Sequence, residues 1–159
     1  MTEKPALQQN RAVECLRAWN PRAVSEVLEF RGETTVVVLR ESLVGAAELL
    51  RGDSSLLFNF LSDLTCVDRF PNEPRFELNY HLLSISTREK LRVRVRVSGS
   101  DPVVSSLTSV WPGINWHERE TFDLFGVRFE GHPDLRRILL PQDWQGHPLR
   151  KDFPVEGIR

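Results

Sequence analysis

A chain of 159 residues, 40% hydrophobic and 27% charged, is long enough for one globular domain with its own core. Its net charge of -1 gives no general attraction to nucleic acid or anionic lipid, and its two cysteines form no CxxC motif for a disulfide framework or a thiolate metal site. Because the cysteines suggest neither, a reducing compartment is expected. The longest apolar runs fall far short of the roughly 20 residues of a membrane-spanning helix, and the N-terminus lacks the apolar core of a signal peptide.

In the first part of the chain, apolar spacing and turn residues predict a mixture of helices and strands. Pro21 ends the first helix because the residue before a proline avoids the helical region. Ser42 is the predicted N-cap of the second helix, and Gly52 closes it. Residues 55–68 are ambiguous, since their first half also fits a helix. The expected elements are a helix at 6–19, strands at 24–30 and 34–39, a helix at 43–50 and a strand at 64–67.

The clearest local pattern is a hairpin within residues 76–97. Apolar side chains occupy every second position of both strands, so the hairpin is predicted to have one apolar face and one polar face. Three polar positions of its second strand are arginines, Arg92, Arg94 and Arg96. Because no aromatic residue lies between them to stack bases, we interpret them as a solvated face with Glu77 as a neighbour.

The next segment predicts a third short helix and completes the fold class. Asp101 is placed to open a helix over residues 103–110, which Trp111 and the Pro-Gly pair after it terminate. Helices mixed with hairpin strands indicate an α+β fold, a single domain with helices packed on a largely antiparallel sheet. We expect a compact domain at residues 1–112, followed at residues 113–159 by a signature segment and an extended, irregular C-terminal tail that wraps a partner.

Residues 117–154 contain acids, arginines, aromatics, glycines and prolines at a higher density than any earlier stretch. Gly126 is placed to end a helix, on which Arg119 and Asp123 lie four residues apart. Asp134 is predicted to cap the turn that follows it. The expected elements are a helix at 116–125, an extended piece at 127–129 and a turn at 135–139, in which Arg136 and Arg137 point in different directions.

Two motifs in this stretch, in the right order and spacing, resemble the signature of the C subunit, or 30 kDa subunit family, of the proton-pumping NADH:quinone oxidoreductase, respiratory complex I. Residues 1–110 match that family only in layout. Because the chain stops soon after Pro154, the stand-alone form is expected and not the form fused to the D subunit. The matching residues are Glu118-Arg119-Glu120, Asp123, Gly126-Val127, Phe129 and His132 to Leu139, then Trp144, Gly146 and Pro148 to Pro154.

The resemblance implies a non-catalytic scaffold subunit in the hydrophilic arm of complex I, chiefly in contact with the D and B subunits. No cofactor is expected in this chain, whereas FMN and iron–sulfur clusters are expected in partner subunits that pass electrons from NADH to quinone, coupled to proton translocation. The chain would lie peripherally on the cytoplasmic face of the bacterial inner membrane, through its partners. Its residues agree, since it has no cysteine cluster, no GxGxxG and no P-loop.

We predict that the tail contacts its partner through basic side chains, chiefly arginines, through carboxylates and through aromatic side chains. Arginine and aromatic residues contribute much of the binding energy at protein interfaces. The predicted polar contacts are Glu118, Arg119, Glu120, Asp123, His132, Arg136, Arg137, Arg150, Lys151 and Asp152. The predicted apolar contacts are Trp116, Phe122, Phe125, Phe129, Trp144 and Phe153.

A small metal-dependent hydrolase is the first alternative, with ligands from the tail's histidines and acids: His117, Glu118, His132, Asp134 and His147. However, these histidines do not have the i, i+4 spacing of a helical pair, and two of them precede prolines, so structural histidines are favoured and no metal site is predicted.

Two further alternatives concern acid–base chemistry and the identity of the complex. Glu118 with Glu120 or Asp123 could form a carboxylate pair, but arginines crowd all three, which favours ion pairing. A nucleic-acid module is disfavoured by the net charge. The nearest alternative is the equivalent subunit of a membrane-bound hydrogenase or a related dehydrogenase, since this chain does not by itself identify the electron donor.

Overall fold

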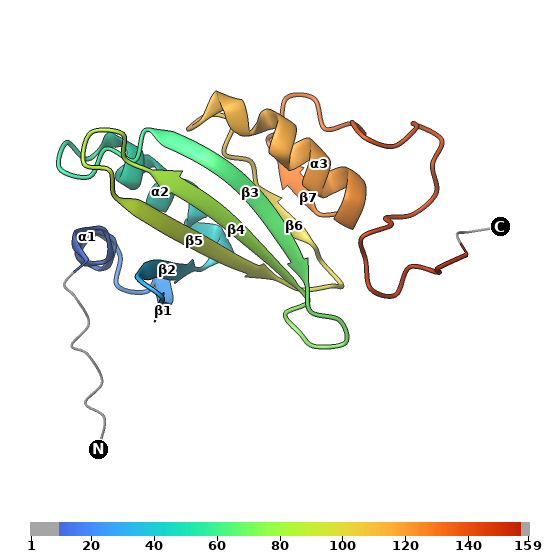
Figure 1. Ribbon diagram of the computed structural model, residues 1–159, viewed down its shortest axis with the longest axis horizontal. Coiled ribbons are helices and arrows are strands. Elements are labelled where there is room, and N and C mark those ends of the chain that lie inside the picture. The colour runs from blue at the N-terminus through green and yellow to red at the C-terminus, as the bar shows by residue number, and fades with distance from the viewer. Residues whose placement is uncertain (1–9, 157–159) are drawn as a thin grey trace, which may run out of the picture.

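The computed structural model describes residues 10–156, in which three α-helices pack on a mixed, mostly antiparallel sheet of five strands (Figure 1). No helix in this described range is long and apolar enough to cross a membrane. The elements are α1 (Arg11–Trp19), β1 (Val24–Phe30), β2 (Glu33–Val38), η1 (Arg40–Ser42), α2 (Leu43–Gly52), β3 (Phe60–Asp68), β4 (Phe76–Leu83), β5 (Lys90–Val97), β6 (Val103–Ser105), η2 (Pro112–Ile114), α3 (Asn115–Phe125) and β7 (Arg128–Glu130).

The sheet has the strand order β1-β2-β5-β4-β3, and its only parallel pair within the described range is β2 with β5. Apolar and polar residues alternate along β4 and β5, which places the apolar side chains on one face of the sheet. There they join α1, α2 and the segment from β6 to β7 in one core. Leu78, Tyr80 and Val95 are almost completely buried in it. The predicted α+β class, the sheet and the hairpin of β4 and β5 are confirmed, and the strands predicted at 24–30 and 34–39 form a second hairpin, β1 with β2.

The first two helices lie close to where periodicity places them. Asn10 is the N-cap of α1, and its side chain accepts hydrogen bonds from the backbone N–H groups of Ala12 and Val13. The helix therefore begins later than predicted, and Ala6, in the predicted first turn, lies outside the described residues. Ser42 lies at the N-cap position of α2, as predicted, but it ends a short 3₁₀ turn and its side chain makes no capping hydrogen bond.

One ambiguous segment and one predicted helix are not helical in the structure. Residues 54–56 form a turn that leads into β3, which begins at Phe60. The helix predicted at 103–110 is wrong, because Val103–Ser105 forms β6 and pairs in parallel with β7. Two β-branched valines suit a strand, but their partner lies 25 residues further on, which local spacing does not reveal.

Residues 113–130 pack against the earlier part of the chain. Helix α3 contacts β3, and β7 completes the small two-stranded sheet with β6. Ile114, Val127 and Phe129 belong to the same buried cluster as the five-stranded sheet. The segment after β7, orange to red in Figure 1, has no helix or strand up to residue 156 and lies beside α3. The predicted irregular tail thus corresponds to residues 131–156, and the division at residue 112 stays a prediction.

Candidate partner-binding surface

Glu118, in the first turn of α3, is a fully buried carboxyl group that joins this helix to the segment after β6. Its Oε1 accepts the backbone N–H of Leu107 at 2.7 Å, and its Oε2 accepts the hydroxyl of Ser106 at 2.6 Å. Burial raises the pKa of Glu118 to about 7, against these two hydrogen bonds, which lower it. The group is therefore poised between its charged and neutral forms near neutral pH.

The imidazole of His132 is fully buried beside Glu118, with its Nε2 3.9 Å from Glu118 Oε2. The backbone N–H of Asp134 donates to Nδ1 at 3.0 Å, so Nδ1 must be the acceptor. Nε2 then carries the proton and donates to the carbonyl of Asn115 at 3.3 Å. These bonds assign one neutral tautomer and anchor the start of the tail to the start of α3.

Asp123, also fully buried, is the centre of the tail's backbone hydrogen bonding. Its Oδ2 accepts three successive N–H groups, from Ile138, Leu139 and Leu140, at 2.8 to 3.0 Å. Its Oδ1 accepts Arg137 Nη1 at 2.5 Å. Burial alone would raise the pKa of Asp123, but the hydrogen bonds hold it below its usual value.

This arrangement explains why the turn predicted at 135–139 is not helical. The N–H groups that would close helical turns there bind the Asp123 carboxylate instead. The predicted cap is also wrong, because the Asp134 carboxylate accepts Arg136 Nε at 2.8 Å.

The arginines of the tail and of α3 donate hydrogen bonds to backbone carbonyl groups as well as to carboxylates. Arg137 donates to the carbonyls of Trp144 and Gly146, each at 3.0 Å. Arg119, on α3, donates to the carbonyls of Arg136 and Arg137 at 3.1 and 3.2 Å. Arg136 itself points outward and is 65% exposed, whereas Arg137 is 13% exposed. The prediction that these two arginines point in different directions is confirmed.

The aromatic residues of the predicted interface differ in exposure. Trp116 is 61% exposed and Trp144 is 40% exposed, so both offer apolar surface to a partner. Phe129 is buried in the core, and Phe122 and Phe125 are half-buried against it. Among the remaining residues, Glu120, Lys151 and Asp152 are exposed, and Arg150 and Phe153 are half-buried.

The predicted contact residues fall into two groups, buried and exposed, and their contact with a partner stays a prediction in both. Glu118, Asp123 and Phe129 are enclosed by this chain, so any effect they have on a partner would act through the tail or helix that they hold. Trp116, Trp144 and the other exposed side chains remain predictions for direct contact.

Sequence reasoning missed two buried polar residues, Asp68 at the end of β3 and Arg75 immediately before β4. They bind Lys151 and Asp152, at the far end of the tail. Charged residues flank the sequence Phe-Pro-Asn-Glu-Pro, but nothing local indicates partners about 80 positions away along the chain.

The face of the sheet opposite the core carries the arginines of β5. Glu77, 6% exposed, accepts Arg69 Nη2 at 2.8 Å and Arg96 Nε at 3.1 Å, and Arg94 lies 3.9 Å away. The prediction of Glu77 as their neighbour is confirmed. The face is less solvated than predicted, because the arginine stems cover Glu77 and Asn79.

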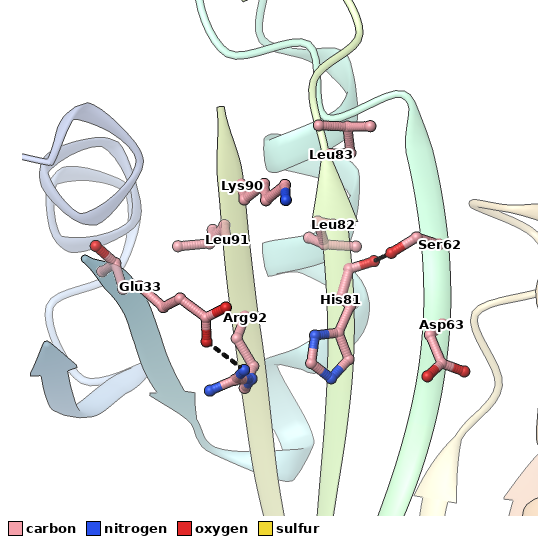
Figure 2. A pocket seen from close by; sticks show the side chains of 10 residues that line it. Glu33, Ser62, Asp63, His81, Leu82, Leu83, Lys90, Leu91 and Arg92 are labelled. Atoms are coloured by element: carbon pink, nitrogen blue, oxygen red, sulfur yellow. Dashed lines mark hydrogen bonds and ion pairs between the residues drawn. The ribbon is translucent and has the colours of Figure 1, made fainter. Parts of the chain in front are cut away.

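A hollow of about 370 Å³ lies at one end of this face, between β2, β5, β4 and β3 (Figure 2). Arg92 Nη2 binds Glu33 Oε2 at 2.6 Å on one side, and Asp63 lies on the other. His81 lies between them, and burial together with Arg92 lowers its pKa. These side chains largely neutralise one another, so the hollow lacks the convergent polar groups of a ligand site.

The histidines of the metal hypothesis have separate partners. His117 Nε2 lies 3.8 Å from Asp63, His132 binds Asn115, and His147 Nδ1 lies 2.9 Å from the carbonyl of Asp123. In the part of the chain that the structure describes, no three His, Cys, Asp or Glu residues are grouped to hold a metal ion.

Known proteins similar to this chain share both its sequence and its fold. Residues 36–159 match the family described as respiratory-chain NADH dehydrogenase, 30 Kd subunit. The C subunit of the NADH-quinone oxidoreductase of Roseiflexus sp. (strain RS-1) is 51% identical over 150 residues, covering 94% of this chain and 86% of the relative. That of Geobacter sulfurreducens is 45% identical over 151 residues, covering 94% and 92%.

Two solved structures extend the likeness to three dimensions. The trypsin-resistant fragment (1-134) of Nqo5 is 32% identical, with a TM-score of 0.66, covering 79% of this chain and all of the fragment. A chain of the membrane-bound sulfane sulfur reductase, an archaeal respiratory membrane complex, has a TM-score of 0.75 at 23% identity, covering 91% of this chain and 85% of that one, and shows the fold alone.

The fold and the hydrogen-bonded tail therefore define an α+β domain with an irregular C-terminal segment fixed against it. The chain belongs to the family of 30 kDa subunits of the respiratory-chain NADH dehydrogenase, represented among its relatives by the C subunits of NADH-quinone oxidoreductases. The resemblance inferred from the motifs is confirmed, and the hydrogenase and hydrolase alternatives are not favoured.

Proposed function

We propose that this chain serves as the C subunit of an NADH-quinone oxidoreductase and that its role there is structural. The observation that carries the structural role is the tail, which has no regular structure from residue 131 to 156 and yet is held by Asp123 at three backbone N–H groups. Exposed apolar side chains, including Trp144, lie on this fixed segment. A rigid, irregular, partly apolar surface suits the binding of another protein.

In this proposal the partners are other subunits of the hydrophilic arm, chiefly the D and B subunits. FMN and iron–sulfur clusters belong to partner subunits, which pass electrons from NADH to quinone, coupled to proton translocation, while this chain holds no cofactor. It lies peripherally at the cytoplasmic face of the bacterial membrane, attached through its partners.

Purification of a tagged copy from its native membranes in mild detergent tests this function. We expect co-purification of flavin and iron–sulfur subunits, identified by mass, together with NADH:quinone activity. A lone chain with bound metal would overturn the proposal in favour of the histidine hypothesis. A large assembly without NADH:quinone activity would instead identify a sister complex.

Truncation before Trp144 tests the tail's part in that role. The shortened chain loses the two carbonyl acceptors of Arg137 at Trp144 and Gly146, together with every residue after them. We expect the sheet to remain folded, because its core lies outside the removed segment, and the tagged chain to bring down far less of its partners. Full assembly of the truncated chain would show that the tail is dispensable.

A further inference from the structure

A buried ion pair lies at the end of the sheet beside the tail. Asp68, the last residue of β3, is 3% exposed, and Arg75, immediately before β4, is 9% exposed. Arg75 Nε and Nη2 donate to the two carboxylate oxygens of Asp68 at 2.9 and 2.8 Å. This bidentate geometry fixes the guanidinium in one orientation before any other group binds it.

The same guanidinium also binds the tail. Arg75 Nη1 and Nη2 donate to the two oxygens of Asp152 at 3.0 and 2.6 Å. The backbone N–H of Lys151 donates to Asp68 Oδ2 at 2.8 Å, which closes the contact from the other side. We call Asp68, Arg75, Lys151 and Asp152 the tail latch.

The surroundings of the tail latch balance its charge. Arg150 donates through Nε to the carbonyl of Phe125 at 2.6 Å, and its guanidinium lies 5.3 Å from the Phe76 ring centre. Arg75 lies 5.0 Å from the centre of the same ring. Two guanidiniums therefore stand with two carboxylates around one aromatic ring, a neutral arrangement that suits partial burial.

Hydrogen bonds of Asp68 explain why it stays charged when buried. Burial alone would raise its pKa, but hydrogen bonds from Arg75 and from the backbone N–H groups of Lys151 and Phe70 outweigh this effect and hold the pKa at about 2. The tail latch is therefore closed throughout the physiological pH range.

The position of the tail latch gives it a role beyond local stability. Between β7 and residue 156 the chain has no helix or strand, and apart from the hydrogen bond of the Leu149 N–H to the Leu124 carbonyl, the bonds described above that hold it to the rest of the protein involve side chains. Asp123 holds the middle of the tail at residues 138–140, and the tail latch holds its end at residues 151–152. Without the second attachment, the segment after Gly146 would lose its main connection to the sheet.

We propose that Arg75 and Asp68 are tail-positioning residues, which hold the end of the tail in its partner-binding shape before the partner arrives. This inference rests on the proposed function, because it assumes that the tail binds another subunit. Neither residue needs to contact the partner. Their contribution is preorganisation, since a segment that is already ordered loses less conformational freedom on binding.

Hydrogen exchange of the full-length chain tests the positioning step without any partner. We compare the wild type with Asp152→Asn, which removes only the tail's carboxylate from the latch, and with Arg75→Gln. Amides of residues 149–153 should exchange about tenfold faster or more in both variants, because charge-assisted hydrogen bonds are lost. Core amides of β4 and β5 should be unchanged in Asp152→Asn, which guards against loss of the whole fold in Arg75→Gln.

Arg69→Gln is the matched control for this experiment. Arg69 lies in the same loop and also binds a carboxylate, but its acceptor is Glu77, which keeps Arg94 and Arg96 as neighbours. This variant should leave exchange at residues 149–153 unchanged. Equal exchange at these residues in the wild type, Asp152→Asn and Arg75→Gln would overturn the proposal.

A double variant in the assembled complex separates positioning from direct contact. If Asp152 acts through Arg75, the combined variant should reduce the yield of co-purified subunits no more than the worse single variant. Additive losses, or a loosened tail with full assembly, would overturn the positioning role while leaving the proposed function intact. Failure of the wild type itself to join an NADH-quinone oxidoreductase would overturn the proposed function, whereas the exchange rates would still decide whether Arg75 holds the tail.

Discussion

At the residue scale, two buried carboxyl groups of α3 have opposite electrostatic behaviour. Asp123 receives an arginine and three backbone N–H groups, so its charged form is stabilised. Glu118 accepts hydrogen bonds from only one N–H and one hydroxyl, so the effect of burial, which raises its pKa, outweighs theirs. The difference follows from the number of donors, and it makes Glu118 the residue with the clearest pH dependence near neutrality.

Glu118→Gln should therefore flatten the pH dependence of stability. The folded pKa of about 7 lies above the reference value of 4.5, so this group's stabilising contribution is fully present below pH 4.5 and is lost as pH rises through 7. The wild type should lose up to about 3 kcal/mol from this source, whereas glutamine can accept from Leu107 and donate to Ser106 at any pH. Urea unfolding at pH 5 and pH 8 measures the difference, with exposed Glu120→Gln as the control. Parallel profiles for the wild type and Glu118→Gln would contradict this account.

Arg136 and Arg137 form a natural pair for a second prediction. Arg137→Ala leaves the buried Asp123 carboxylate without its cation, which should cost about 3 to 5 kcal/mol of unfolding free energy. Arg136→Ala breaks only an exposed pair with Asp134, and a loss below about 0.5 kcal/mol is expected. Denaturant unfolding of both variants measures the two losses of unfolding free energy. Equal losses would contradict the assignment of Arg137 as the cation that stabilises the buried Asp123 carboxylate.

From the sequence alone, Arg136→Ala is expected to leave a folded domain with impaired assembly, on the ground that a buried partner is left unpaired. In this chain the partner, Asp134, is exposed, so that physical reason does not apply within the chain itself. Impaired assembly would have to arise from contact with another protein of the complex. The yield of subunits co-purified with Arg136→Ala measures this, and full assembly would count against an interface role for Arg136.

At the element scale, the end of α3 joins the helix to the tail. Gly126 has φ of +74°, and its N–H donates to the carbonyl of Phe122. A Cβ at this position would lie 2.5 Å from His147 Cδ2 and 2.6 Å from Arg150 Nη2. Helix termination and tail docking therefore both require glycine here.

Gly126→Ala should destabilise the protein by about 1 to 3 kcal/mol through the strained backbone and the displaced tail. The control is Gly113→Ala, because a Cβ there would meet no atom within 4 Å. Thermal and urea unfolding of the two variants should differ clearly. Equal stabilities would mean that the tail yields to the extra methyl group at little cost.

Helices and strands with a strong apolar period were predictable one by one. The hairpin of β4 and β5 and the helix α3 lie where the pattern places them, because each depends mainly on neighbours close in sequence. β6 was mistaken for a helix because its partner strand is β7, and residues 135–139 were mistaken for a helical turn because their N–H groups bind Asp123. In both cases a distant partner outweighed the local preference.

At the scale of the whole molecule, the core includes residues on both sides of position 112. A fragment of residues 1–112 would lack Ile114, Val127 and Phe129, which pack into the main cluster. A fragment of residues 1–143 retains them. We expect the longer fragment to unfold cooperatively in urea and the shorter one to be strongly destabilised, as followed by circular dichroism. A cooperative transition of normal stability in the shorter fragment would instead support an independent domain at residues 1–112.

The predicted contacts with a partner stay predictions, but the structure shows what shapes the segment that carries them. Asp123, Arg137 and Arg150 make hydrogen bonds that are central to its path. Residue type alone did not separate those that hold the tail from those that face outward. Arg136 and Arg137 are adjacent and chemically identical, yet the side chain of one is 65% exposed and that of the other 13%.

Local sequence was sufficient for the α+β class, the two hairpins, α3 with its glycine end, and the family, because these depend on periodicity and on ordered motifs that are close along the chain. The path of the tail and its contacts with Asp68 and Arg75 emerged only from the three-dimensional arrangement. Their hydrogen bonds join positions 77 to 83 residues apart. Such pairings arise when folding brings distant segments to one end of a sheet, and neither residue carries a local signal of its partner.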